Sequence, residues 1–273
     1  MYDPRILSWK GLDRVSILTL HGRQIIPVVM DGSHRARMDR IRGQADLIYR
    51  DGRFFLAVVV DVSEPPPLQP DDWLGVDLGI VNLAADSDGQ TYSGAHVNGL
   101  RKRHAKLRQR LQKKGTKSAK RLLKKRRRRE QRFAANENHC IAKQVVTYAQ
   151  DTRRGIALED LQGIRDRITV RRAQRRRHHS WAFYQLRQFV TYKAHLAGVP
   201  VVLVDPRNTS RTCPACGLTD KRNRPNQASF RCIGCGFAGP ADTIAAGNIA
   251  RRAAVNRPDA GSAAEQVPAS SAL

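Results

Sequence analysis

Two pairs of cysteines constrain this chain more than any other feature of its sequence. Cys213 and Cys216 form the first pair, Cys232 and Cys235 form the second, and fifteen residues separate them. Two thiolates with two residues between them can face one tetrahedral Zn²⁺, and the glycine that follows each pair permits a tight turn. The spacing therefore predicts a zinc ribbon. Because four thiolates close the coordination shell, the zinc is expected to be structural, and any catalytic group must come from elsewhere.

Length and residue types limit the kind of protein that the chain can be. Its 273 residues suffice for one domain with a full core and one or two small modules. No stretch has the length and apolar character of a membrane span, and residues 1–4 do not begin a signal peptide. We therefore expect a soluble, cytoplasmic protein without a membrane partner. The fifth cysteine, Cys140, lies in a helix-like segment and is predicted to be a core residue, which suits a reducing compartment.

The chain carries a large excess of positive charge. It has 49 Lys and Arg against 24 Asp and Glu, a formal net charge of +25. Such an excess predicts a polyanionic partner, because each phosphate that a basic side chain neutralises releases condensed counterions. The charge is also uneven: residues 100–134 hold eighteen Lys or Arg and one acid, and residues 165–177 hold seven Arg and one acid.

The first basic run has two interpretations. A charge run is often a solvated face or a disordered tail, but here leucines recur while Gly and Pro are nearly absent. This pattern favours long helices over about 97–150, broken near Gly115, with basic faces turned toward nucleic acid. The candidate nucleic-acid-binding residues of the chain are Arg101, Lys102, Arg103, Lys113, Lys114, Lys124, Lys125, Arg126, Arg127, Arg171, Arg172, Arg175, Arg176 and Arg211.

The first 64 residues are rich in β-forming side chains. A hairpin signal, Asp51-Gly52, separates two of the expected strands, and three prolines at 65–67 begin a linker over 65–72. Residues 1–64 are therefore predicted to form a small antiparallel sheet or partial barrel without an obvious catalytic group. The expected strands cover 16–20, 24–30, 45–50 and 53–62.

After the linker, apolar strands and helices alternate, which predicts an α/β core. The expected elements are an apolar run at 73–85, a return strand at 91–93, strands at 155–161 and 199–204, and helices at 181–196 and from 241 onward. The expected divisions are the β module 1–64, the linker 65–72, the core 73–208, the zinc ribbon 209–239, a helix that resumes the core at 240–256, and a disordered tail at 257–273.

Three acidic residues stand at the edges of these core elements. Asp77 lies inside an apolar strand, Glu159 ends another, and Asp242 opens the last helix. Acids far apart in sequence can converge, and three carboxylates with a substrate phosphate suffice to hold catalytic Mg²⁺ or Mn²⁺. Asp242 could instead cap its helix and Glu159 could end its strand in solvent, whereas Asp77 is costly to bury without a positive partner. Asp160 and Asp205 are alternative members of the trio.

Several motifs occur together in a fixed order: GVDLG at 75–79, LEDL at 158–161, NTSRTCPACG at 208–217 and ADTIAAGNI at 241–249. In this order they closely resemble the TnpB (OrfB) family encoded by insertion sequences, whose relatives include the type V CRISPR effector nucleases. The resemblance covers roughly residues 20–255. It implies an RNase H-like (RuvC) nuclease core with an inserted zinc ribbon that binds target nucleic acid, preceded by a β-barrel wedge module.

The resemblance also implies an activity and its residues. Family members are RNA-guided DNA endonucleases whose guide RNA comes from the transposon end, which implies target DNA as the substrate and a bacterial cytoplasm as the place of action. By motif, Asp77, Glu159 and Asp242 match the first, second and third RuvC acids, and the four cysteines match the ribbon ligands. Two features depart from the family pattern: the chain begins part-way through the wedge barrel, and Ile244 stands where the family commonly has Asn.

Two other functions stay open. One is a cleavage-deficient, shortened relative that binds RNA or DNA, which the short N-terminal region favours and the three retained acids oppose. The other is a strand-transferring transposase, because acidic triads of such enzymes can share the RNase H-like fold. The long basic segments suit a guide RNA better, so the RNA-guided, metal-dependent endonuclease is the leading hypothesis.

Overall fold

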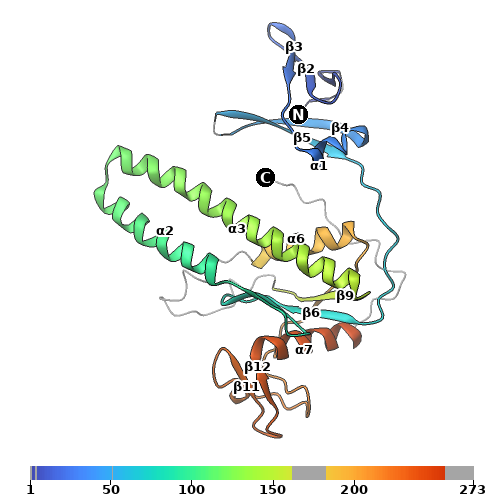
Figure 1. Ribbon diagram of the computed structural model, residues 1–273, viewed down its shortest axis with the longest axis vertical. Coiled ribbons are helices and arrows are strands. Elements are labelled where there is room, and N and C mark those ends of the chain that lie inside the picture. Colours follow the sequence, from blue (N-terminus) through green and yellow to red (C-terminus); the bar gives the residue numbers. More distant parts are fainter. Residues whose placement is uncertain (1, 4, 51, 162–182, 256–273) are drawn as a thin grey trace. The chain divides into compact units, whose positions relative to one another are not determined.

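The computed structural model describes residues 2–3, 5–50, 52–161 and 183–255 (Figure 1). The chain divides into two compact units, Met1–Glu64 and Pro65–Leu273, and each is described by itself. The second arginine run at 165–177, with Arg171, Arg172, Arg175 and Arg176, and the tail at 257–273 lie outside the described residues.

The N-terminal unit contains two antiparallel sheets. Strands β1 (Leu7–Trp9), β2 (Arg14–Thr19) and β3 (Gly22–Pro27) form one, and β4 (Ile41–Arg50) pairs with β5 (Arg53–Val60) in the other. The helical turns α1 (Gly32–Arg35) and η1 (Met38–Arg40) connect the two sheets. The four strands expected here are confirmed with shifted ends, and the structure adds β1. A barrel is not established by this arrangement.

A five-stranded sheet forms the centre of the second unit. Its strand order is β10-β9-β6-β7-β8. Strands β6 (Trp73–Asp77), β7 (Asn82–Asp86) and β8 (Thr91–Ser93) are antiparallel neighbours, whereas β9 (Gly155–Glu159) and β10 (Val201–Val204) run parallel to β6. The carboxyl ends of β6, β9 and β10 therefore lie at one edge of the sheet.

Helices cover both faces of this sheet (Figure 1). Alternate side chains of β6 point to opposite faces, as strand geometry requires. Leu74 and Val76 pack in one cluster with α3 (Lys117–Asp151) and α6 (Phe183–Leu196), while Trp73 packs in another with Ile249 of α7 (Ala241–Val255). The expected α/β core is confirmed.

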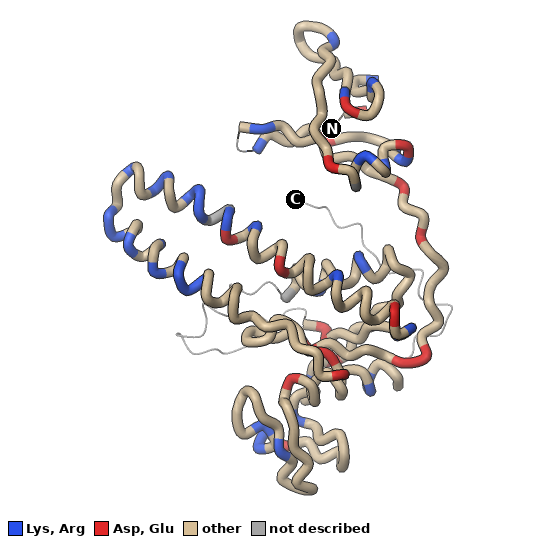
Figure 2. Tube along the Cα trace, viewed as in Figure 1, with Lys and Arg blue, Asp and Glu red and all other residues tan. Residues whose placement is uncertain are grey.

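The first basic run forms a pair of long helices, as expected. Helix α2 (Ala95–Lys114) ends at Gly115, whose positive φ of 66° suits a residue without a Cβ atom. Thr116 then caps α3 by accepting a hydrogen bond from the backbone N–H of Ala119. Lys and Arg occur along both helices of this hairpin (Figure 2). Within the described residues, no helix combines the length and apolar character needed to cross a membrane.

Two sequence expectations need correction. The apolar run at 73–85 contains two strands, β6 and β7, because residues 78–81 turn the chain back at Gly79, where a Cβ atom would meet the carbonyl oxygen of Asn82 at 2.6 Å. Cys140 was expected in the core but is exposed. The residues of α3 that pack in the sheet cluster include Phe133, Ile141, Ala142 and Val145, and Cys140 is not among them.

Candidate functional site

Two of the three expected acids leave the sheet side by side. Strands β6 and β9 are parallel neighbours in which Val76 pairs with Leu158. The next residues, Asp77 and Glu159, are therefore adjacent at the carboxyl ends of the two strands. Ligand sites in sheets with parallel strands favour this edge.

Helix α7 adds the third acid. Asp242 lies in its first turn, and the helix packs closely on β6, because a Cβ atom at Gly75 would overlap the carbonyl oxygen of Ala246. The first glycine of the GVDLG motif is thus required by helix packing. Asp242 and Glu159 both act electrostatically on Asp77, so the structure brings the three acids into one neighbourhood.

The environment of these acids disfavours their negative charges. Burial and, to a smaller extent, the carboxylates of Glu159 and Asp242 raise the pKa of Asp77 to about 7, and Arg224 opposes them. Burial also raises the pKa of Glu159, although the Thr209 hydroxyl, which donates to its Oε1 atom, has the opposite effect. A bound cation would stabilise the negative charges of carboxylates that are buried close to one another. The oxygen atoms of these three acids therefore fit a hard divalent ion.

Side chains from distant segments hold Asp242 and Thr209. Asn82 Nδ2 donates to Asp242 Oδ2 at 2.9 Å, and an Arg224 guanidinium nitrogen donates to Asp242 Oδ1 at 3.3 Å. Asn248, largely buried in α7, donates from Nδ2 to the carbonyl oxygen of Thr209 at 2.8 Å. Both carboxylate oxygens of Asp242 thus accept hydrogen bonds from side chains, in contrast to a simple helix cap.

The two alternative acids have other partners. Asp160 accepts a hydrogen bond from Arg187 at 2.8 Å, and Asp205 Oδ1 accepts one from the backbone N–H of Arg207 at 3.0 Å. Asp205 lies close enough to Glu159 to raise the pKa of that carboxyl. Neither acid is among the groups that shift the pKa of Asp77. Asp77, Glu159 and Asp242 therefore remain the preferred trio.

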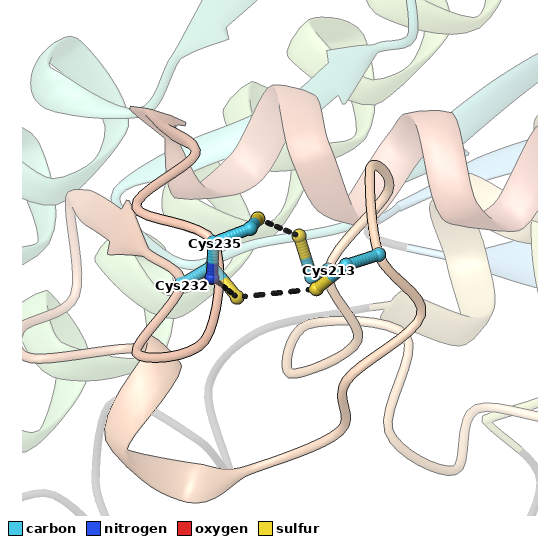
Figure 3. A group of neighbouring side chains, drawn as sticks. Cys213, Cys232 and Cys235 are labelled. Carbon is cyan, nitrogen blue, oxygen red and sulfur yellow. Dashed lines mark hydrogen bonds between the residues drawn. The ribbon is translucent and has the colours of Figure 1, made fainter.

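The four cysteines form a second, more compact cluster (Figure 3). Their sulfur atoms all lie within 4.8 Å of one another, with Cys213 and Cys235 3.6 Å apart and Cys216 and Cys232 3.5 Å apart. Four sulfurs at about 2.3 Å from a tetrahedral Zn²⁺ would be roughly 3.8 Å apart. The cluster can therefore hold such an ion. In the described part of the chain, the oxygens of the three acids are not gathered this tightly.

Backbone groups support thiolate character at Cys232. The N–H groups of Cys235 and Gly234 approach the Cys232 sulfur at 3.5 and 3.4 Å, and the bond from Cys235 is the main cause that lowers the pKa of Cys232 to about 6. The cysteine segment also contains η2 (Lys221–Asn223), β11 (Ser229–Arg231) and β12 (Ala238–Pro240). Ile244 of α7 packs with Phe230 of this segment, which explains an apolar residue at that position.

Comparison with known proteins gives two family matches. The family described as "Probable transposase" (OrfB_IS605) matches residues 57–162, and "Cas12f1-like, TNB domain" matches residues 183–249. The TnpB-like protein MJ0751 of Methanocaldococcus jannaschii is 32% identical over 125 residues, which are 45% of this chain and 44% of that protein. The resemblance to the TnpB (OrfB) family is confirmed.

Other relatives of this chain carry nuclease names. The CRISPR-associated endodeoxyribonuclease Cas12f1 of Sulfoacidibacillus thermotolerans is 41% identical over 119 residues, 43% of this chain and 27% of that protein. The putative RNA-guided DNA endonuclease InsQ of Escherichia coli is 28% identical over 217 residues, 72% of this chain and 53% of that protein. The chain thus spans about a quarter to a half of the length of these curated relatives.

A solved structure supports the fold. The Cas12f1 chain in a complex with sgRNA and target DNA has a TM-score of 0.54 with this chain at 18% identity, covering 84% of this chain and 58% of that one. At this identity the likeness concerns the fold. It is consistent with the mixed α/β architecture around which the acids are arranged.

The candidate nucleic-acid-binding residues differ in how far their side chains are exposed to solvent. Most of those whose side chains the structure describes are exposed, whereas Arg101 and Arg126 are partly buried, and burial lowers the pKa of Arg101. The only acid of the run, Glu130, accepts a hydrogen bond from Arg108 at 2.7 Å and links α3 to α2. The Arg127 side chain lies outside the described atoms. The exposed candidates are Lys102, Arg103, Lys113, Lys114, Lys124, Lys125 and Arg211.

Three site residues were missed by sequence analysis: Asn82, Thr209 and Arg224. Asn82 and Thr209 are neutral and carry no pattern of their own, although Thr209 lies inside a recognised motif. Arg224 is one basic residue among 49 Lys and Arg. Only the folded path of the cysteine segment brings Arg224 to Asp242.

Proposed function

We propose that the chain contains the RuvC-like catalytic core of an RNA-guided, divalent-metal-dependent DNA endonuclease of the TnpB type. One observation carries this proposal: Asp77, Glu159 and Asp242 come from three separate elements and meet at one sheet edge, where they interact electrostatically. The relatives named as endodeoxyribonuclease and RNA-guided DNA endonuclease support the same reading.

The sheet topology supports an RNase H-like core. Three antiparallel strands in sequence order are followed by two strands parallel to the first, with helices on both faces. The cysteine segment interrupts this core between β10 and α7 and would form the zinc ribbon. The two antiparallel sheets of residues 1–64 would represent the wedge module.

The acid site has the groups that phosphodiester hydrolysis needs. Asp77, Glu159 and Asp242 would hold Mg²⁺ or Mn²⁺, which would stabilise the attacking and leaving oxygens of an in-line displacement. Arg224 already lies beside Asp242 and can donate hydrogen bonds to a phosphate oxygen. Asn82 and Thr209 keep two of the acids oriented. The cysteines would bind a structural Zn²⁺.

The basic hairpin suits the proposed partners. A guide RNA from the transposon end and a target DNA both present phosphates, and base pairing between them would supply sequence recognition while the protein holds the backbone. Exposed Lys and Arg along α2 and α3, and Arg211 in the cysteine segment, are the proposed contacts. The proposed place of action is the cytoplasm.

Cleavage of a plasmid with a matched target, by protein copurified with RNA from the adjoining transposon end, tests the proposal in Mg²⁺. Asp77→Ala, Glu159→Gln and Asp242→Ala should each lower cutting by roughly a thousandfold or more. RNA binding should persist, because the proposed phosphate contacts lie on other segments. Asp160→Asn and Asp205→Asn are matched controls that should keep cutting. Unchanged cutting in any of the first three variants would refute the assignment of that acid.

A nucleic-acid-binding protein without cleavage is the second candidate. It is favoured by the exposed Lys and Arg along α2 and α3, which can bind phosphates without any cleavage. Binding that survives EDTA, together with an intact plasmid in Mg²⁺ and Mn²⁺ under all guide conditions, would favour this alternative.

A further inference from the structure

A buried amide joins the two halves of the cysteine cluster. Asn223 lies between the cysteine pairs and is fully buried. Its Nδ2 atom donates to the carbonyl oxygens of Arg211 and Leu218, each at 2.9 Å, and its Oδ1 atom accepts from the backbone N–H of Ile233 at 3.0 Å. Arg211 and Leu218 flank the first cysteine pair, and Ile233 lies inside the second. Asn223 thus satisfies backbone groups on both sides of the cluster.

The next residue in the chain reaches the acid site. Arg224 donates to Asp242 Oδ1 at 3.3 Å and to the carbonyl oxygen of Gln227 at 2.9 Å. Its side chain is about a quarter exposed, at 26%, so water only partly screens its charge. It also acts electrostatically on Asp77 and Glu159. Arg224 is therefore a cation of the cysteine segment that interacts with all three acids.

The covalent link between these residues connects the two sites. A flexible arginine side chain loses conformational entropy when it is held in one place. If the backbone from which the side chain starts is already fixed, fewer alternative conformations compete with the one that reaches Asp242. The three hydrogen bonds of Asn223 fix the backbone at the residue directly before Arg224. The backbone N–H of Arg224 adds a weaker bond to the carbonyl oxygen of Lys221 at 3.3 Å.

We propose that Asn223 is a positioning residue that holds Arg224 against the acid site, so that the folded cysteine segment determines the cationic charge at the three carboxylates. This inference rests on the proposed function, because it assigns a role within the same site. Asn223 itself touches neither the acids nor a reacting group. It acts through Arg224.

A purely structural role for Asn223 makes a different prediction. If the amide only stabilised the ribbon, its loss would alter the acid site to the same extent with or without Arg224. If it positions Arg224, its loss should have no further effect once Arg224 has been replaced. A double-mutant cycle separates these cases.

The experiment measures Mn²⁺ affinity by titration calorimetry of the zinc-loaded full chain without nucleic acid. The Arg224 guanidinium competes with a divalent ion for Asp242 and repels it, so Arg224→Gln should tighten Mn²⁺ binding by about three- to tenfold. Asn223→Ala should tighten it by a similar factor, and the double variant should match Arg224→Gln alone. Arg222→Gln is the matched control: Arg222 lies in the same loop and pairs with Asp220, and its loss should leave the affinity unchanged.

A second variant guards against loss of the ribbon. Asn223→Gln keeps the amide but lengthens the side chain by one methylene, and zinc content measured on each variant shows whether the cluster remains loaded. A zinc-loaded Asn223→Ala variant with wild-type Mn²⁺ affinity would overturn the positioning role. The positioning role would also be overturned if Asn223→Ala changed the Mn²⁺ affinity by the same factor in the wild-type protein and in the Arg224→Gln variant. Mn²⁺ binding that is insensitive to Asp77→Ala and Asp242→Ala would instead refute the proposed acid site itself.

Discussion

At the scale of single residues, Asp77 has the least ordinary environment in the site. Burial and two neighbouring carboxylates raise its pKa to about 7 from 3.8, so the folded protein binds a proton there that the unfolded chain has released. An acid shifted upward stabilises the fold fully below its unfolded pKa, and this contribution is lost as the pH rises through the folded value. The loss falls between about pH 4 and 7.

This shift gives a measurable pH dependence. In zinc-loaded protein without added Mg²⁺, the free energy of unfolding should fall as the pH rises from 5 to 8, with about 3 kcal/mol as the upper limit of the contribution of Asp77 over this range. Asp77→Asn mimics the neutral acid and should remove most of this dependence in calorimetric melts. Asp151→Asn changes an exposed carboxyl at the end of α3 and should leave the slope as it is. A wild-type slope in the Asp77 variant would contradict the assigned environment.

The acids could be predicted from sequence, but their partners could not. Asp77 stands out because apolar residues flank it, and Glu159 and Asp242 because each lies at the end of a recognisable element. The contacts of Asn82 and Arg224 with Asp242 span 160 and 18 positions and depend on how α7 and the cysteine segment pack. Local patterns contain no information about such contacts.

At the scale of elements, the basic hairpin of α2 and α3 is the most testable surface. Lys124→Ala combined with Lys125→Ala removes two exposed charges from the basic run. If both contact phosphates, the slope of log binding constant against log salt should become less negative by about 1.4 for single-stranded RNA. Fluorescence anisotropy across a salt series measures this slope.

A matched pair tests whether position or total charge matters. Lys143→Ala with Arg153→Ala removes the same charge near the other end of α3, where both residues are exposed. This pair should change the salt slope by much less. Equal effects of the two pairs would mean that net charge, and not the hairpin surface, governs binding.

The periodicity of apolar residues predicted the presence of helices and strands better than it predicted where each one begins and ends. The leucine pattern and Gly115 indicated two helices, because a helix that ends in a left-handed residue commonly has glycine at that position in the sequence. The run at 73–85 has no such signature, and its division into β6 and β7 depends on pairing with Asp86 and its neighbours across the turn. The exposure of Cys140 likewise follows from the rotation of α3 on the sheet, since the next residues, Ile141 and Ala142, face the cluster instead.

At the scale of the whole molecule, the two units differ in the cores that support them. The core of residues 1–64 centres on Leu7, Val15, Ile17 and Ala45, and large apolar side chains such as Phe54 remain 68% exposed. The second unit has its own extensive clusters on both faces of its sheet. Small domains bury a smaller fraction of their surface and are correspondingly less stable.

This difference predicts how the units behave when separated. Residues 65–273 should fold alone with a cooperative melt, retain zinc, and bind Mn²⁺ with an affinity that still depends on Asp77, because every contact of the acid site described above lies within that unit. Residues 1–64 alone should melt broadly and bind a hydrophobic dye, since their exposed apolar side chains lack a cover. Calorimetry and dye fluorescence on the two fragments measure this. Loss of cooperative folding in residues 65–273 would show that the larger unit depends on the smaller one.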